Sequence, residues 1–145
     1  MSTHTTSVMN ANLVLQTVEG GGLRFDARTG NAAFTLDSGP EVTSPTPLQV
    51  VLAATGGCTG MDVISILEKK RQNITAFEVR VHGERAERDP KKFTSFLVEY
   101  VVTGKGIDPN AVERAVELSE TKYCTVMATL RCTGPIERKI QIREG

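Results

Sequence analysis

A long apolar segment in the first half of the chain restricts its possible folds more than any other feature. Residues 47–71 read PLQVVLAATGGCTGMDVISILEKKR. Pro47 suits the first position of a helix, and Thr46 before it suits the N-cap. The first half is apolar on nearly every side, and a helix of this kind is usually buried. The sequence therefore predicts a central helix over about 47–71 that other elements cover.

Three glycines interrupt this helix around one cysteine. Gly56, Gly57 and Gly60 surround Cys58, and each glycine in a helix interior costs about 1 kcal/mol relative to alanine. We interpret them as clearance for a crossing helix and for a small substrate beside the thiol. Cys58 is therefore a candidate functional residue.

The alternative for Cys58 is a packing role, because free cysteine is among the most buried residue types. The nearby polar side chains favour a functional role, since Thr55 and Thr59 could form hydrogen bonds close to the sulfur. Asp62, one turn further along, would instead disfavour a thiolate.

The other elements predict an α+β fold in a single domain spanning residues 1–145, with residues 1–10 as a loose tail. Alternating or short apolar runs predict strands, and Pro109 after Asp108 marks a helix start. A second short helix, CTVMATLRC, follows a break near residues 121–123. The expected order is β-β-β-α-β-β-α-α-β, with strands LVLQTV, LRFDA, AAFTL, AFEVRVHGERAE, FTSFLVEYVVTG and PIERKIQIRE.

Cys124 is the second candidate, because it precedes the apolar turn of that short helix. Unpaired N–H groups and the positive end of the helix dipole lower the pKa of a thiol there, and Lys122 would act in the same direction. A buried structural cysteine is the alternative. If the two helices pack together, Cys58 and Cys124 could form a redox pair. Cys132 would lie about 12 Å from Cys124 on a continuous helix, so we interpret it as structural or incidental.

Composition argues against several other classes of function. The formal net charge is zero, whereas nucleic acids and anionic membranes favour basic partners. No signal peptide and no uninterrupted apolar run of membrane-spanning length is visible, so we expect a cytoplasmic protein. Only two histidines are present, His4 and His82, and no Cys-x-x-Cys spacing occurs, so we expect no metal site. A cysteine hydrolase would have only His82 as its base.

The two cysteine segments together resemble a known family. SPTPLQVVLAATGGCTGMDVISIL and VERAVELSETKYCTVMATL are similar to the OsmC/Ohr family of thiol peroxidases, and closest to its OsmC-like (YhfA-like) subgroup. The resemblance implies an α+β OsmC-like fold with antiparallel sheets wrapped around central helices in an intertwined homodimer. It also implies that Cys58 attacks an organic hydroperoxide and that Cys124 resolves the sulfenic acid to a disulfide. No bound cofactor is expected, and the reductant would be an external dithiol, possibly of the lipoyl type.

Two positions depart from the family pattern. The family carries a glutamate nine residues before the first cysteine, where this chain has Gln49, and an arginine on a preceding strand, where AAFTLDSG has none. Arg24 or Arg28 could substitute for that arginine. A thiolate without a cationic partner is less populated at neutral pH. The alternative function is therefore small-hydrophobic-ligand binding or redox sensing on the same fold, with weak or no peroxidase activity.

Overall fold

The structure, a computed structural model, describes residues 8–16, 22–39 and 41–131. The chain divides into two compact units, residues 1–53 and 54–145, each of which is described by itself below. The expected closing strand PIERKIQIRE, Cys132, and most of the N-terminal tail lie outside the described residues. The expectation of a single domain stays a prediction.

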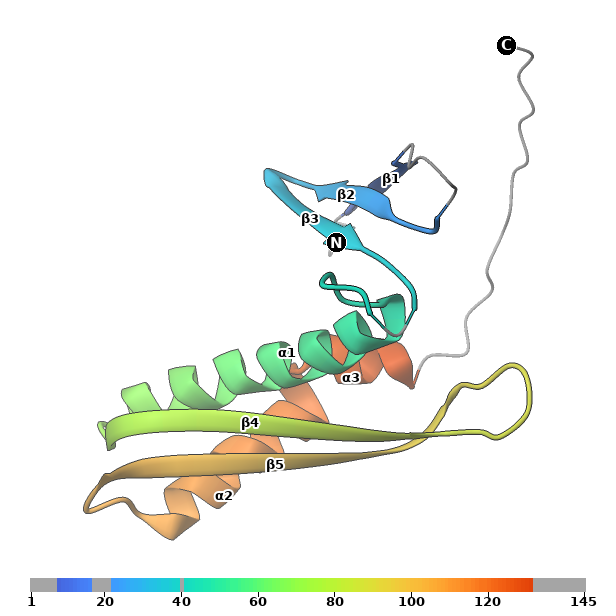
Figure 1. Cartoon of the computed structure of the whole chain (residues 1–145). Coiled ribbons are helices and arrows are strands. Elements are labelled where there is room, and N and C mark those ends of the chain that lie inside the picture. Colours follow the sequence, from blue (N-terminus) through green and yellow to red (C-terminus); the bar gives the residue numbers. More distant parts are fainter. Residues whose placement is uncertain (1–7, 17–21, 40, 132–145) are drawn as a thin grey trace, which may run out of the picture. The chain divides into compact units, whose positions relative to one another are not determined.

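The first unit contains a three-stranded antiparallel sheet. Its strands are β1 (Asn12–Leu15), β2 (Phe25–Thr29) and β3 (Ala32–Leu36), in the order β1-β2-β3 (Figure 1). Thr29 pairs with Ala32 across a two-residue turn, and Gly30 in this turn has a φ of 55°, a conformation that glycine adopts without steric cost. The three predicted strands are confirmed.

Helix α1 (Pro47–Lys69) begins in the first unit and continues into the second. The backbone N–H of Gln49 donates to Thr46 Oγ1 at 3.3 Å, and the Thr46 N–H donates to Gln49 Oε1 at 2.9 Å. This reciprocal pair is a capping box, which satisfies two backbone donors at the helix start. The predicted N-cap is confirmed, and Gln49 has a structural role at the position of the family glutamate.

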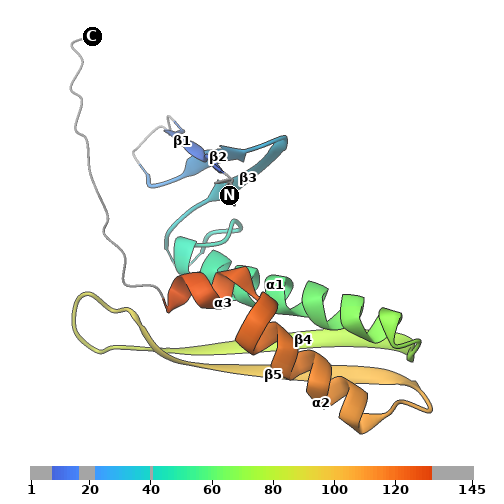
Figure 2. The same ribbon diagram turned by 180° about the vertical axis from the view of Figure 1, so that it is seen from behind.

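The second unit is a long hairpin with helices on one face. Strands β4 (Asn73–Arg85) and β5 (Phe93–Lys105) pair antiparallel. Helices α2 (Pro109–Leu118) and α3 (Thr125–Leu130) and the second part of α1 lie on the same side of the hairpin. Helix α2 passes in front of β5 in Figure 2. Val63 and Leu67 of α1 pack with Ala111 and Ala115 of α2. The partly buried side chains of Phe77 and Tyr100, from the hairpin, pack against this cluster. The α+β class is confirmed, whereas the dimer stays a prediction.

The break between the last two helices is a π-helical turn, Ser119–Tyr123. It replaces the irregular segment expected near residues 121–123. Such turns often occur at functional sites. Here the turn leads directly to Cys124, which has an extended conformation and is the N-cap residue of α3.

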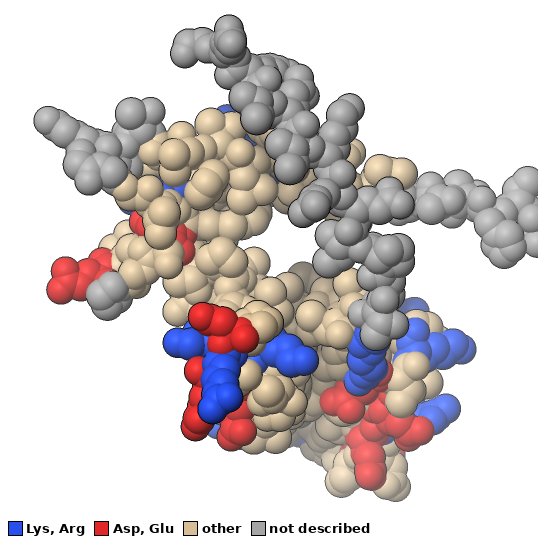
Figure 3. Space-filling view, turned by 90° about the vertical axis from the view of Figure 1, so that its right-hand side faces the viewer, with Lys and Arg blue, Asp and Glu red and all other residues tan. Residues whose placement is uncertain are grey.

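In the described part of the chain, α1 alone has the length and hydropathy of a membrane span, and 33% of its most apolar stretch is buried. Length and composition are weak evidence, because core helices pass the same test. Val63 and Leu67 are fully buried against α2, so we assign the second part of α1 to the core of its unit. Figure 3 shows basic and acidic side chains intermixed on one face.

The glycines of α1 have a different role from the one predicted. A Cβ at Gly56 would lie 2.9 Å from Val81 Cγ2, and one at Gly60 would lie 3.2 Å from Val79 Cγ2. Both glycines therefore give clearance to strand β4 and not to a crossing helix or a substrate. A Cβ at Gly57 would meet nothing within 4 Å. The interpretation of the three glycines as one group is wrong, because only two of them face the sheet.

This difference predicts opposite effects of two neighbouring substitutions. Gly57→Ala should raise the free energy of unfolding by up to about 1 kcal/mol through helix propensity. Gly56→Ala should lower it by about 1–3 kcal/mol, because Val81 is a stiff β-branched residue that must move. Urea unfolding of both variants measures the difference, and equal effects would contradict the assignment.

Candidate active site

The structure brings the two predicted site cysteines together. Cys58 lies in the middle of α1, and Cys124 is at the start of α3. The two sulfur atoms and a carboxylate oxygen of Asp62 all lie within 4.8 Å of one another. Cys58 is partly exposed and Cys124 is buried. The condition set for a redox pair, that the two helices pack together, is therefore met.

Hydrogen bonds from the first turn of α3 stabilise the thiolate of Cys58. Burial by itself would raise the pKa of this thiol. The Val126 N–H, the Thr125 hydroxyl at 3.5 Å, the Cys124 thiol and the Thr125 N–H together outweigh burial, so the pKa of Cys58 is lowered from its ordinary value. Cys58 is thus suited to act as the nucleophile.

Cys124 has the opposite environment. Burial raises the pKa of the Cys124 thiol, and although the Met127 N–H acts against it, Cys58 and the carboxylate of Asp62 raise it further. The prediction that the helix start would lower the pKa of Cys124 is wrong. The reason is geometric: the N–H groups of Thr125 and Val126 point at the sulfur of Cys58. Asp62, which was expected to disfavour a thiolate, raises the pKa of Cys124.

A chain of polar side chains extends from Asp62 away from the sulfurs. Ser119 donates to Asp62, and its hydroxyl lies 2.7 Å from that of Thr59. Thr59 is 2.9 Å from the Tyr100 hydroxyl, which reaches Glu120 at 2.9 Å. Sequence reasoning missed Ser119, Tyr100 and Glu120, since no local pattern links β5 to the π-helical turn. It also missed Thr125, although its place directly after Cys124 was a usable signal.

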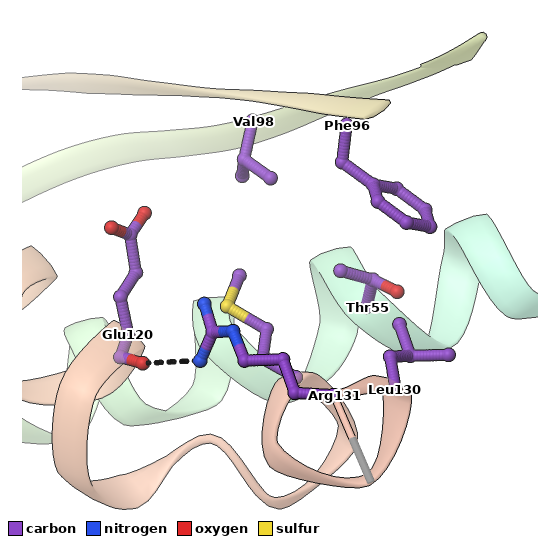
Figure 4. A pocket seen from close by; sticks show the side chains of 7 residues that line it. Thr55, Phe96, Val98, Glu120, Leu130 and Arg131 are labelled. Atoms are coloured by element: carbon purple, nitrogen blue, oxygen red, sulfur yellow. Dashed lines mark hydrogen bonds between the residues drawn. The ribbon is translucent and has the colours of Figure 1, made fainter. Parts of the chain in front are cut away.

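A cavity of about 290 Å³ lies beside this chain. Its apolar wall is formed by β5 and α3, and Glu120 and Arg131 supply its charged groups (Figure 4). Arg131 Nη1 donates to the backbone oxygen of Glu120 at 3.2 Å. The remaining lining residues are Thr55, Phe96, Val98, Met127 and Leu130. The size and lining suit a small apolar ligand with one polar group.

The other residues that the sequence singled out contribute less to this site. His82 is exposed and lies 3.3 Å from Glu99, so the prediction of a solvated histidine is confirmed. Arg24 donates to Ser44 at 3.4 Å, and its Nε is buried with no hydrogen-bond partner among the described residues. Arg24 and Arg28 belong to the first unit, so the support of either for Cys58 stays a prediction.

The donor atoms of Cys58, Asp62 and Cys124 are close enough to contact one small ion. A closed structural zinc site needs four protein ligands, and this group offers three. The expectation that the chain has no metal site stays a prediction.

The asymmetry of the thiols predicts different pH profiles of alkylation. Because the thiolate is the reactive form, iodoacetamide should modify Cys58 at a lower pH than an ordinary cysteine and Cys124 at a higher pH. Thr125→Val should move the Cys58 profile to higher pH and slow its alkylation several-fold at neutral pH. Peptide mass spectrometry measures both thiols. Thr129→Val is the matched control. It also removes a threonine hydroxyl from α3, but that hydroxyl donates to the Thr125 carbonyl at 2.7 Å and not to Cys58. Coincident profiles for Cys58 and Cys124 would contradict the assignment.

Comparisons with known proteins identify the family of the chain. The family described as OsmC-like protein matches residues 38–139. Protein YhfA of Escherichia coli K12 is 45% identical over 87 residues, which are 60% of this chain and 65% of that protein. The chain therefore spans less than two thirds of the curated relatives that it matches.

Solved structures show the same fold. A hypothetical protein from Aquifex aeolicus is 31% identical, with a TM-score of 0.76 over 87% of this chain and 89% of that one. An organic hydroperoxide resistance protein from Legionella pneumophila is 16% identical, with a TM-score of 0.63 over 88% and 92%. At that identity the likeness concerns the fold alone. The family match and the shared fold lead to one conclusion: the chain belongs to the OsmC-like protein family.

Proposed function

We propose that the protein is a thiol peroxidase that reduces organic hydroperoxides through Cys58 and Cys124. The observation that carries this proposal is the pair of neighbouring sulfurs with opposite pKa shifts. A lowered pKa suits a nucleophile, and a buried thiol that stays protonated suits a resolving group that acts second. The name of the Legionella pneumophila structure supports the same chemistry.

The reaction has three balanced steps. The Cys58 thiolate attacks the outer peroxide oxygen, the O–O bond breaks, and the alkoxide leaves as an alcohol after taking a proton. The Cys124 sulfur then attacks the Cys58 sulfenic acid, an S–S bond replaces the S–O bond, and water leaves. An external dithiol, possibly of the lipoyl type, reduces the disulfide by thiol–disulfide exchange.

The cavity supports an organic substrate over hydrogen peroxide. Phe96, Val98 and Leu130 offer an apolar wall, and Thr55 of the same cavity lies one helical turn before Cys58. Burial of apolar substrate surface is favourable by about 25 cal/mol per Å². We therefore propose hydroperoxides with an alkyl or aryl body as the substrate class.

We further propose a cytoplasmic homodimer. Met61 of α1 is 77% exposed and Leu97 of β5 is 58% exposed in the single chain. Large apolar side chains on a central helix and on a sheet face are typical of surfaces that a second subunit covers. A partner would also explain why the helix is apolar on nearly every side.

A disulfide test examines the proposed chemistry directly. Equimolar cumene hydroperoxide should convert the reduced protein to a form with an intramolecular Cys58–Cys124 disulfide, detected by peptide mass spectrometry. Cys124→Ser should stop at a Cys58 sulfenic acid that dimedone traps, and Cys58→Ser should not react. Cys132→Ser is the control and should form the disulfide normally. Thiols that stay reduced in excess peroxide would refute the proposal.

A second candidate is a binding protein for a small hydrophobic ligand or a redox sensor with little turnover. The cavity and the absence of arginine from residues 32–39 favour it. A ligand that co-purifies in native mass spectrometry, together with slow turnover by the wild-type protein, would support this candidate.

A further inference from the structure

One carboxylate faces both sulfurs of the thiol pair. A carboxylate oxygen of Asp62 and the sulfur atoms of Cys58 and Cys124 all lie within 4.8 Å of one another. Asp62 comes from α1, one helical turn after Cys58, whereas Cys124 comes from the start of α3. The proposed function uses the two thiols and gives the carboxylate no part. A carboxylate this close to both sulfurs can exchange a proton with either, directly or through one water.

The second step of the proposed reaction needs a base at Cys124. A thiol attacks as the thiolate, or it loses its proton while it attacks. Cys124 is only 4% exposed, so bases in solution have little access to it. Burial, together with the neighbouring Cys58 and Asp62, also raises the pKa of Cys124, so little thiolate is present at neutral pH. A protein group that takes the proton therefore accelerates this step.

Asp62 is held in place and has access to water. Ser119, which is fully buried, donates to a carboxylate oxygen of Asp62 at 2.9 Å. A carboxylate has about four acceptor sites, so this bond leaves sites for a proton. Asp62 is partly exposed and lines a hollow of about 400 Å³. The carboxylate therefore lies between a buried thiol on one side and a hollow on the other.

Among the described residues, few other groups near the thiols can accept a proton. The titratable groups that lie beside Asp62 or line its hollow are Cys58, Cys124, Lys69, Lys70 and Tyr123. A lysine ammonium group has no acceptor site, and a neutral phenol is a weaker base than a carboxylate. Glu120 of the π-helical turn accepts from Tyr100 and lines the other cavity. Asp62 is therefore the acceptor best placed for the Cys124 proton.

We propose that Asp62 is a catalytic residue that moves one proton from Cys124 to the departing oxygen of Cys58. This step rests on the proposed function. The S–H bond of Cys124 breaks and its proton passes to the Asp62 carboxylate while the S–S bond forms. The S–O bond of Cys58 breaks, and the departing hydroxide takes the proton from Asp62 and leaves as water. The Cys124 sulfur is oxidised, the Cys58 sulfur is reduced, and no net proton is consumed.

This role predicts an effect of opposite sign to that of the charge alone. The charge of Asp62 raises the pKa of Cys124, so its removal by itself would give more thiolate and faster closure of the disulfide. Removal of a base makes closure slower. Asp62→Asn removes both the charge and the base but keeps an oxygen that can accept from Ser119. The direction of its effect therefore decides between the two roles.

A mixed disulfide tests the base without any peroxide. In a Cys132→Ser parent, dithiobis-nitrobenzoate couples one thionitrobenzoate to Cys58, and attack by Cys124 then releases it as a coloured thiolate. Asp62→Asn should close about tenfold more slowly at neutral pH, at a rate proportional to hydroxide. The parent should vary less with pH across the neutral range and should close more slowly in D₂O. Equal or faster closure in Asp62→Asn would overturn the inference.

Glu68→Gln is the matched control for this experiment. It removes an exposed carboxylate from the same helix and changes the net charge by the same amount. It should close at the rate of the parent. Far-ultraviolet circular dichroism and thermal unfolding confirm that each variant is folded.

Closure after peroxide tests the second half of the transfer. Thionitrobenzoate leaves as a stable thiolate and needs no proton, whereas the hydroxide of the sulfenic acid needs one. With stoichiometric cumene hydroperoxide, Asp62→Asn should therefore lose more, about a hundredfold in the closure phase that follows formation of the sulfenic acid. A loss no larger than with thionitrobenzoate would overturn delivery of the proton to the departing oxygen.

Formate provides a test by chemical rescue. Asp62→Ala leaves a space that a small carboxylate can enter from the hollow. Formate should speed thionitrobenzoate release from Asp62→Ala several-fold, and chloride at the same concentration should not. Formate that has no effect on this variant would overturn the role of Asp62 as a base.

The outcomes also separate this inference from the proposed function. If the wild type forms no sulfenic acid, the peroxidase proposal fails, and thionitrobenzoate release still decides whether Asp62 acts as a base. The parent protein supplies a test that needs no substitution at Asp62. A parent closure rate proportional to hydroxide, with no slowing in D₂O, would overturn the inference even where the Asp62 variants do not fold.

Discussion

The close contact between α1 and strand β4 determines the rest of the site. Gly56 and Gly60 have no side chains where Val81 and Val79 approach the helix, so the helix lies directly on the sheet. This contact fixes the rotation of α1 about its axis. Cys58 then faces α3, and Thr59 and Asp62 face the π-helical turn. An added methyl group at Gly56 would separate the helix from the sheet and displace those side chains.

The same arrangement gives two chemically identical thiols different properties. Cys58 receives N–H groups from the start of α3, whereas Cys124 is buried beside the carboxylate of Asp62. The difference arises from the position of each sulfur relative to one short helix. A thiol at a helix start in the sequence can receive only part of the N–H groups of that start, as Cys124 receives the one of Met127 while those of Thr125 and Val126 reach Cys58. Those groups stabilise whichever acceptor lies in front of them in space.

Several buried polar groups of the second unit lie beside its apolar core. Val63, Leu67, Ala111 and Ala115 form that core, and Thr59 and Ser119 are equally buried next to it. Buried hydroxyls need hydrogen-bond partners. Here the partners of Thr59 and Ser119 are other side chains of the same hydrogen-bonded series. The π-helical turn makes this possible, because it places Ser119 against Thr59 and its neighbour Glu120 against Tyr100.

Local patterns in the sequence were sufficient for the elements and for the two cysteines. Alternation of apolar residues predicted the hairpin, Thr46 and Asp108 marked helix starts, and the glycines drew attention to Cys58. These features depend on neighbours along the chain, whose spacing a sequence shows directly. Tertiary structure decided which glycines face the sheet, which thiol has the lowered pKa, and that Asp62, Thr59 and Tyr100 share one network. Those properties depend on contacts between α1, β5 and the π-helical turn, which lie far apart in the sequence, and packing alone brings them together.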